Sequence, residues 1–177
     1  MPSVVLTLLG PDRPGMVNAI SDSASAHGAN WTDSLMANFA GQFAGIVQLD
    51  VTPERCDALM LALRSLEAPD LHILVSRADA IGRPMDTRRL QLDLIGHDRP
   101  GIIQTISGEL ARHGVGIDTL QTHITSGAMS GEQMFQMHAG LTVPVVLDTD
   151  TLRAGLEGLA NELMVDITFD QPTATPS

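Results

Sequence analysis

Two short segments of this chain carry the same residue types at the same spacing, and those types suit the binding of an anion. Residues 10–15 and 96–101 both read Gly-x-Asp-Arg-Pro-Gly. An apolar run precedes each segment and a helical pattern follows it. The N–H groups at the start of a helix lack partners within the helix and lie at the positive end of its dipole. Each turn is therefore predicted to suit a small anion such as a carboxylate.

The four glycines of these turns have expected roles. Gly10 and Gly96 are expected to allow a turn that larger side chains forbid. Gly15 and Gly101 are expected to let a ligand approach the backbone closely. The turn is not a phosphate loop, because it lacks both the Gly-rich spacing and the Lys-Ser/Thr ending that a nucleoside triphosphate requires.

The aspartates of the turns leave two interpretations open. Asp12 and Asp98 can accept hydrogen bonds from loop N–H groups or from a ligand ammonium. In a purely structural interpretation, the aspartate caps the helix and the proline sets its first turn, while the arginine pairs with a surface carboxylate. One copy of the turn alone does not decide between these two interpretations.

No set of residues in the sequence predicts catalysis. A catalytic site needs a nucleophile, a paired acid and base, or a cluster of metal ligands. His123 and His138 could face each other across a hairpin, but their spacing is no local metal signature and a third ligand is not obvious. Cys56, the single cysteine, lies in a helical pattern and is interpreted as a structural thiol. The sequence therefore predicts neither an enzyme, nor a metal site, nor a cofactor.

The turns belong to a longer internal repeat, and the repeat identifies the elements that position them. A shift of 86 residues aligns residues 6–31 with 92–117, and 11 of these 26 pairs are identical. Further along, the leucines of a second helix align only with a shift of 93, so the second copy carries seven extra residues. These residues are assigned to an enlarged hairpin loop at 125–132.

In each copy, alternating apolar residues predict an opening strand, and a helix is predicted after the turn. In the first copy, Pro14 suits the first helical turn. Val17, Ile20 and Ala24 then recur at helical spacing until Gly28 ends the helix.

A hairpin, a second helix and a fourth strand complete each copy. In the first copy, the hairpin strands are expected at about 30–39 and 43–51. Thr52 and Pro53 predict a helix start with a hydroxyl cap, and Pro69 is expected to end that helix. The last strand of each copy is marked by alternating apolar residues: Leu71, Ile73 and Val75 in the first, and Val165, Ile167 and Phe169 in the second.

The order β-α-β-β-α-β, present twice, predicts an α+β protein of two ferredoxin-like modules, in which the helices pack on one face of antiparallel sheets. The modules are expected at residues 1–79 and 87–170, with a linker at 80–86 and a flexible tail at 171–177.

Composition excludes several classes of protein. The formal charge of −11 at pH 7 and the absence of a basic run disfavour direct binding to nucleic acid. Five aromatic residues, four Phe and one Trp, are too few for a base-stacking surface. The N-terminus lacks the features of a signal peptide, and no apolar run is long enough to span a membrane. The sequence therefore predicts a cytoplasmic protein.

The strand, the Gly-x-Asp-Arg-Pro-Gly turn, and a helix ending in His-Gly together resemble the ACT domain. The resemblance covers almost the whole chain, twice. Two such modules without an attached enzyme are similar to the family of the glycine cleavage system transcriptional repressor. This resemblance implies a regulatory protein whose modules pair side by side and bind an amino acid at the seam.

The resemblance also implies which residues bind, because the turn of one module faces the start of the second strand of its partner. The first candidate site combines Gly96, His97, Asp98, Gly101 and Ile102 with Asn30 and Trp31. The second combines Gly10, Asp12, Gly15 and Met16 with Gly116 and Ile117. Asn30 brings an amide where Gly116 has no side chain, so the first site is expected to bind better.

The expected function is non-catalytic sensing of an amino acid, in transcriptional control of amino-acid metabolism such as that of glycine. The protein is expected to be a homodimer and to act through a DNA-binding regulatory protein. The alternative is a protein–protein interaction module with structural, ligand-free loops.

Overall fold

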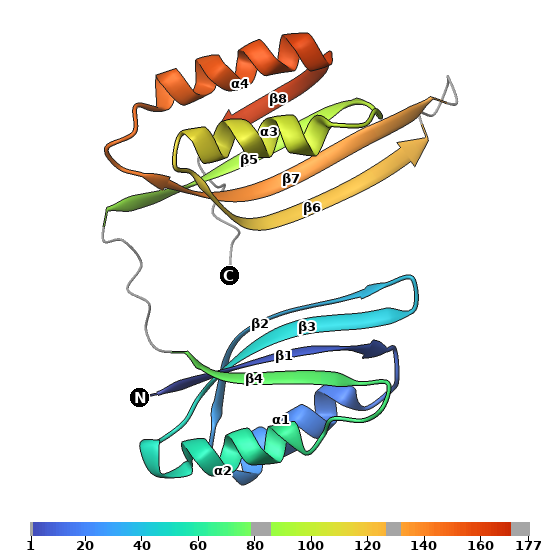
Figure 1. Ribbon diagram of the computed structural model, residues 1–177, viewed down its shortest axis with the longest axis vertical. Helices are drawn as coiled ribbons and strands as arrows, with labels where there is room; N and C mark the ends of the chain where they lie inside the picture. The colour runs from blue at the N-terminus through green and yellow to red at the C-terminus, as the bar shows by residue number, and fades with distance from the viewer. Residues whose placement is uncertain (1, 79–85, 127–131, 171–177) are drawn as a thin grey trace. The chain divides into compact units, whose positions relative to one another are not determined.

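The chain folds into two units with the same order of elements. The computed structural model describes residues 2–78, 86–126 and 132–170. The units are Met1–Gly82, the first module, and Arg83–Ser177, the second module. Each has the order β-α-β-β-α-β (Figure 1). The predicted linker, apart from Asp86, and the predicted tail lie outside the described residues.

The elements of the two modules correspond one to one. The first module contains β1 (Ser3–Pro11), α1 (Met16–Ala26), β2 (Asn30–Phe39), β3 (Gln42–Asp50), α2 (Pro53–Arg64) and β4 (His72–Ala78). The second contains β5 (Thr87–His97), α3 (Ile102–Arg112), β6 (Gly116–Ser126), β7 (Gln133–Pro144), α4 (Thr149–Leu163) and β8 (Val165–Asp170). Within residues 2–78, 86–126 and 132–170, no helix is both long and apolar enough to cross a membrane.

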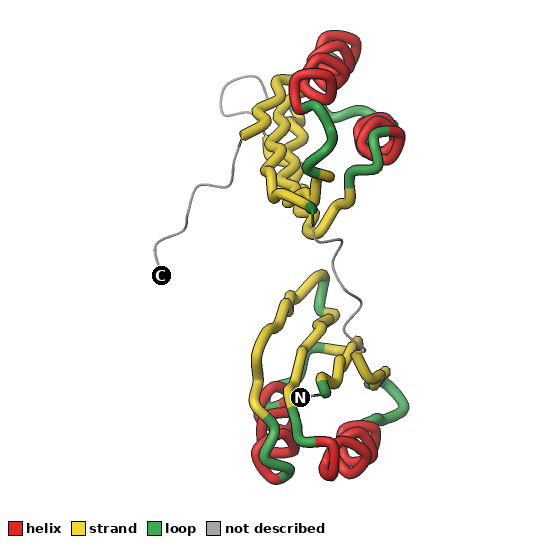
Figure 2. Tube along the Cα trace, turned by 90° about the vertical axis from the view of Figure 1, so that its left-hand side faces the viewer, coloured by secondary structure: helices red, strands yellow, loops and turns green. Residues whose placement is uncertain are grey.

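Each module is a four-stranded antiparallel sheet with both helices on one face (Figure 2). The strand orders are β2-β3-β1-β4 and β6-β7-β5-β8, so the first strand of each module lies inside its sheet. This is the predicted ferredoxin-like arrangement, and the α+β fold class is confirmed.

Alternation along the inner strands builds each core. In β1, Val4, Leu6 and Leu8 are buried, while the residues between them lie on the opposite face. Leu59 and Leu63 of α2 pack against them and are also fully buried. Burial of one such leucine contributes about 1.5–3 kcal/mol. Cys56 belongs to the same buried cluster.

The first helix of the first module differs from its prediction at two positions. It begins at Met16, after Gly15, so Pro14 precedes the helix instead of lying in its first turn. Val17 is 44% exposed, because the stripe that faces the sheet consists of Ile20 and Ala24.

The second helix starts where predicted but ends earlier. The helix begins at Pro53, but the Thr52 hydroxyl does not cap it. The pKa of Glu54 is lowered by hydrogen bonds to its carboxylate. The bond from its own backbone N–H has the largest effect, and the bond from the Thr52 side chain has the next largest. The helix ends at Arg64 and not at Pro69, because the N–H groups of Leu66 and Glu67 bond to the carbonyls three residues back and the α-helical pattern stops.

The two modules differ most clearly in the connection from the second helix to the last strand. In the first module it runs over residues 65–71 and is held by a bridge between Ala68 and Leu71. In the second module a single residue, Met164, joins α4 to β8 in a left-handed conformation with φ 51°.

The hairpins differ in the opposite direction, because here the second module has the longer loop. Gly41 turns the first hairpin with φ 80°, as expected from its sequence. In the second, β6 extends to Ser126 and β7 begins at Gln133. Thr125 and Ser126 therefore lie in a strand and not in the predicted loop, and residues 127–131 of that loop lie outside the described residues.

Gly10 and Gly96 have a different role from the one predicted. Both lie within strands and not in a turn. A Cβ atom on Gly96 would lie 2.9 Å from Cβ of Val165 and 3.0 Å from its Cα. On Gly10 it would lie 2.8 Å from the carbonyl oxygen of Asp70. Gly96 therefore allows β8 to approach β5 closely, and Gly10 allows the chain that leads into β4 to approach β1.

A methyl group at Gly96 is expected to destabilise the second module. Gly96→Ala forces Val165 and its backbone away, and such overpacking lowers the free energy of unfolding by about 1–3 kcal/mol. Gly108→Ala is the matched control, because a Cβ there meets nothing within 4 Å and lies inside α3. That change is expected to raise stability by about 0.5–1 kcal/mol. Urea unfolding measures the stability of both variants. Equal unfolding midpoints for Gly96→Ala and Gly108→Ala would contradict the close approach of Val165 to Gly96.

Candidate functional site

Both turns place an uncapped helix start at the end of the first strand. Gly15 and Gly101 are the N-cap residues of α1 and α3, with φ of 95° and 97°. Neither helix start has a side-chain cap. The first bond within each helix runs from Ala19 N–H to the Gly15 carbonyl and from Thr105 N–H to the Gly101 carbonyl. The N–H groups before these donors have no partner within the helix.

The aspartates of the turns are not helix caps, which corrects the structural interpretation. Their backbone N–H groups tie the turns to the hairpins: Asp12 donates to the Gly41 carbonyl at 3.0 Å and Asp98 to that of Gln133 at 2.9 Å. The Asp12 carboxylate also accepts from the Asn38 amide at 2.7 Å. In the first module, the aspartate therefore fastens the turn to the far end of β2.

The arginines of the two turns have different partners. Arg13 forms an ion pair with Asp70, which confirms the predicted surface carboxylate. The guanidinium of Arg99 instead donates to the backbone carbonyl of Glu162, at 3.3 Å. His97, two residues before Arg99, lies 3.6 Å from the Glu132 carboxylate, measured from Nδ1 to Oε2.

A cavity of about 280 Å³ lies beneath the turn of the first module. Its wall combines the turn, the first helix and the connection 65–71 with residues of β1 and β4. Gly15 and Met16, predicted as site residues, are in this wall. Asp70 and Leu71 were not predicted, because nothing in the local sequence indicates that the connection folds back beneath the turn.

The corresponding part of the second module is more tightly filled. Ile102, which aligns with Met16, is 2% exposed, whereas Met16 is only partly buried. Val165 packs directly against Gly96 there. The single-residue connection between α4 and β8 leaves less chain at this end of the module.

The start of the second strand lies far from the turn within a module. Asn30 pairs with Asp50, which in turn pairs with Ser3 at the start of β1. The turn follows Pro11 at the other end of the same strand. Asn30 and the turn of its own module are thus at opposite ends of one sheet, and the structure of a single module does not bring them together.

The other residues at these strand starts also differ between the modules. Trp31 is half-buried and packs on the first core, whereas Ile117, its counterpart, is exposed. Gly116 is exposed at the first position of β6. In both strands a bulge follows immediately, between Trp31 and Asp33 and between Ile117 and Thr119.

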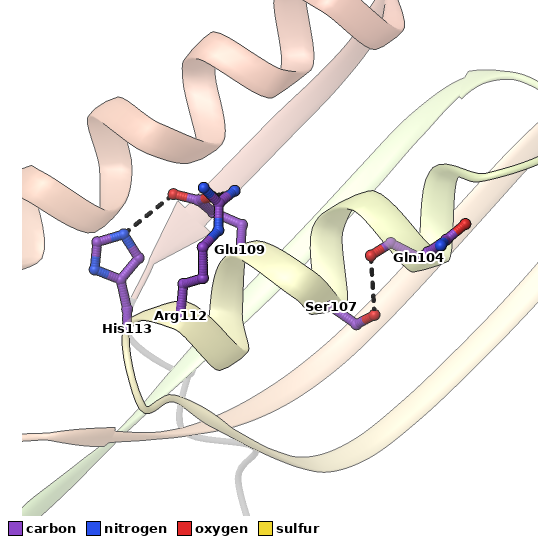
Figure 3. Close-up of polar contacts among 5 residues, drawn as sticks. All are labelled: Gln104, Ser107, Glu109, Arg112 and His113. Atoms are coloured by element: carbon purple, nitrogen blue, oxygen red, sulfur yellow. Dashed lines mark hydrogen bonds and ion pairs between the residues drawn. The ribbon is translucent and has the colours of Figure 1, made fainter.

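Glu109 carries the main buried charge outside the turns. The residue is 7% exposed, and its carboxylate forms an ion pair with Arg112, while Nε2 of His113 lies 3.1 Å from Oε1 of the same carboxylate (Figure 3). A Cβ on Gly155 of α4 would lie 2.5 Å from Glu109 Oε1, so this cluster packs against the neighbouring helix. It stabilises the contact between α3 and α4.

The two histidines of the second hairpin, His123 and His138, do not face each other. Nδ1 of His138 lies 2.5 Å from the Asp93 carboxylate, on the sheet face away from the helices. His123 pairs in register with Gln136 and not with His138. Across the described part of the chain, no three His, Cys, Asp or Glu side chains are grouped so that they could hold a metal ion.

Known proteins share both the modules and their tandem order. Residues 3–75 match the family model of the ACT domain. The glycine cleavage system transcriptional repressor of Escherichia coli (strain K12) is 27% identical over 164 residues, which cover 90% of this chain and 85% of that protein.

Two crystal structures resemble the chain along almost its whole length. One, of an unknown protein from Galdieria sulphuraria, has a TM-score of 0.82 and 28% identity, and the match covers 97% of this chain and 99% of the other. Another, of a putative glycine cleavage system transcriptional repressor, shares the fold with a TM-score of 0.67 and 19% identity, over 96% of each chain. The first module therefore matches the ACT domain, the second module repeats its order of elements, and the whole chain is similar to the glycine cleavage system transcriptional repressor.

Proposed function

We propose that this protein is a non-catalytic regulator that binds an amino acid at its turns and acts on transcription through a protein partner. One observation carries the proposal: α1 and α3 both begin at a left-handed glycine without a side-chain cap. The similarity to the glycine cleavage system transcriptional repressor of Escherichia coli supports a regulatory role.

An amino acid suits the chemistry of these turns. Its carboxylate can bind to the unpaired N–H groups at the helix start, where the dipole contributes about 0.3–1 kcal/mol to an anion. Its ammonium can bind to a carboxylate of the turn, such as that of Asp98. Both charges of the ligand therefore have complementary groups within a few residues.

A protein partner is proposed because the chain itself repels nucleic acid. Its formal charge is −11 at pH 7, and a phosphate backbone attracts the opposite sign. We propose that the protein works in the cytoplasm through a DNA-binding regulator, in the control of amino-acid metabolism. The name of the Escherichia coli relative supports glycine metabolism as the regulated process.

Binding of an amino acid is expected to raise the melting temperature. A ligand that binds only the folded state stabilises it by about 2.7 kcal/mol at a concentration of 100 Kd, which corresponds to several degrees for a chain of this size. Thermal unfolding of the full chain with each of the common amino acids at millimolar concentration measures the effect. If none of them raises the melting temperature, the proposal is wrong and the interaction-module alternative is left.

The residues of the first predicted site remain a prediction and can be tested one at a time. Asp98→Ala and Asn30→Ala are each expected to weaken amino-acid binding about tenfold, equivalent to about 1.4 kcal/mol. Asp22→Ala, which removes an exposed carboxylate in the middle of α1, is the matched control and should leave affinity unchanged. Titration calorimetry compares the three. Unchanged affinity in both site variants would show that the ligand binds elsewhere.

An uncharged row on the first module supports the proposed homodimer. On the sheet face away from the helices, Leu35, Ile46, Thr7 and Leu74 lie side by side in register across all four strands. Leu35 is 60% exposed, Ile46 is 46% exposed and Leu74 is 69% exposed. The matching row of the second module is polar and comprises Gln121, His138, Asp93 and Thr168. Two strongly acidic copies can approach with less repulsion through a row of residues without charges.

A charge in this apolar row is expected to separate the proposed dimer. Leu74→Asp places a carboxylate in the row, and burying it between two copies without a partner is costly. Thr168→Asp, at the equivalent place in the second module, is the matched control. Sedimentation velocity at tens of micromolar should show dimers for the unaltered chain and the control, and monomers for Leu74→Asp. Monomers throughout would contradict the homodimer.

A further inference from the structure

We propose that the cavity beneath the first turn binds the side chain of an aliphatic α-amino acid. This inference rests on the proposed function and extends it, because it names the class of ligand and places the ligand's side chain inside one module. The cavity of about 280 Å³ lies near the lower end of the range for ligand pockets, roughly 300–1,000 Å³. Its size suits a single amino acid.

The lining of the cavity matches an apolar side chain. Its inner wall is built from aliphatic and thioether groups: Leu8, Met16, Ala19, Ile20, Leu71 and Ile73. Each methylene buried there is expected to strengthen binding about fourfold. A ligand without a side chain, such as glycine, would make no apolar contact with this wall. The wall therefore favours side chains of the size of valine, leucine, isoleucine and methionine.

The charges around the cavity match the two charges of an amino acid. Arg13 and Asp70 also line it, and their side chains are 56% and 40% exposed, so water reaches them. The uncapped start of α1, at Gly15 and Met16, lies in the same wall. A ligand carboxylate can take the place of Asp70 beside Arg13 and the helix N–H groups, while the ligand ammonium pairs with Asp70. Every charge then keeps a partner of opposite sign.

The long connection of the first module creates this site. Asp70 and Leu71 both belong to the connection 65–71, which exists because α2 ends at Arg64. In the second module Ile102, which aligns with Met16, is 2% exposed, and one residue replaces the connection. The inference therefore assigns aliphatic selectivity to the first module.

The experiment compares ligands and matched variants of the full chain. Leucine, isoleucine, valine and methionine are titrated by calorimetry beside glycine, serine and aspartate, and leucine is expected to bind at least tenfold more tightly than glycine. Ala19→Leu fills the cavity and should weaken leucine binding at least tenfold. Thr105→Leu, at the equivalent helical position of the second module, should leave it unchanged.

A second variant tests the proposed charges and does not depend on repacking. Asp70→Asn changes an exposed group and should weaken leucine binding about tenfold, since the ammonium loses its partner. The same variant should bind 4-methylpentanoate, which has the carboxylate and alkyl chain but no ammonium, at least as well as the unaltered chain does. Equal weakening for both ligands would contradict the assigned orientation.

The outcomes separate this inference from the proposed function. Aliphatic selectivity that is lost in Ala19→Leu or Asp70→Asn supports the cavity site. Binding of glycine or polar amino acids without aliphatic ones overturns the inference and leaves the sensor in place. Leucine binding unchanged by Ala19→Leu and by Asp70→Asn overturns it in the same way. If no amino acid binds, both the inference and the proposed function are wrong.

Discussion

Each module depends on one constraint, namely that four antiparallel strands bury a single face of their sheet under two helices. Successive side chains of a strand point to opposite faces, so alternate residues of β1 and β5 form the cores. The chain must then reverse direction to lay a helix over that face. Gly15 and Gly101 make the reversal in a left-handed conformation without a capping side chain. The unpaired N–H groups that suit an anion are therefore a direct result of how the core is covered.

Most of the fold could be predicted because the repeat presents one plan twice. Alternation located the strands, and the order of elements follows from it. Helix ends were predicted less well. Pro69 limits how far α2 can run, but the hydrogen bonds around Ser65 end it earlier. Helical spacing likewise grouped Val17 with Ile20, although only packing against the sheet decides which side of a helix is buried.

The candidate site was less predictable, because one residue type serves different physical needs. Gly10 avoids a collision with the chain that leads into β4, whereas Gly15 adopts a positive φ, and the sequence alone does not distinguish these roles. The cavity depends on Asp70 and Leu71, which are distant from the turn in sequence. They reach it because Leu9 pairs with His72, and that pairing is a property of the assembled sheet.

The difference between the open faces of the two sheets has a consequence for assembly. When two copies associate through the same apolar surface, that surface is buried on both copies and the pair is closed. Two different association surfaces on one protomer can instead produce filaments. In the described residues, the row from Leu35 to Leu74 is apolar and its counterpart from Gln121 to Thr168 is polar. This difference between the two rows is therefore what the proposed homodimer requires if it is to stay a closed pair and not grow into filaments.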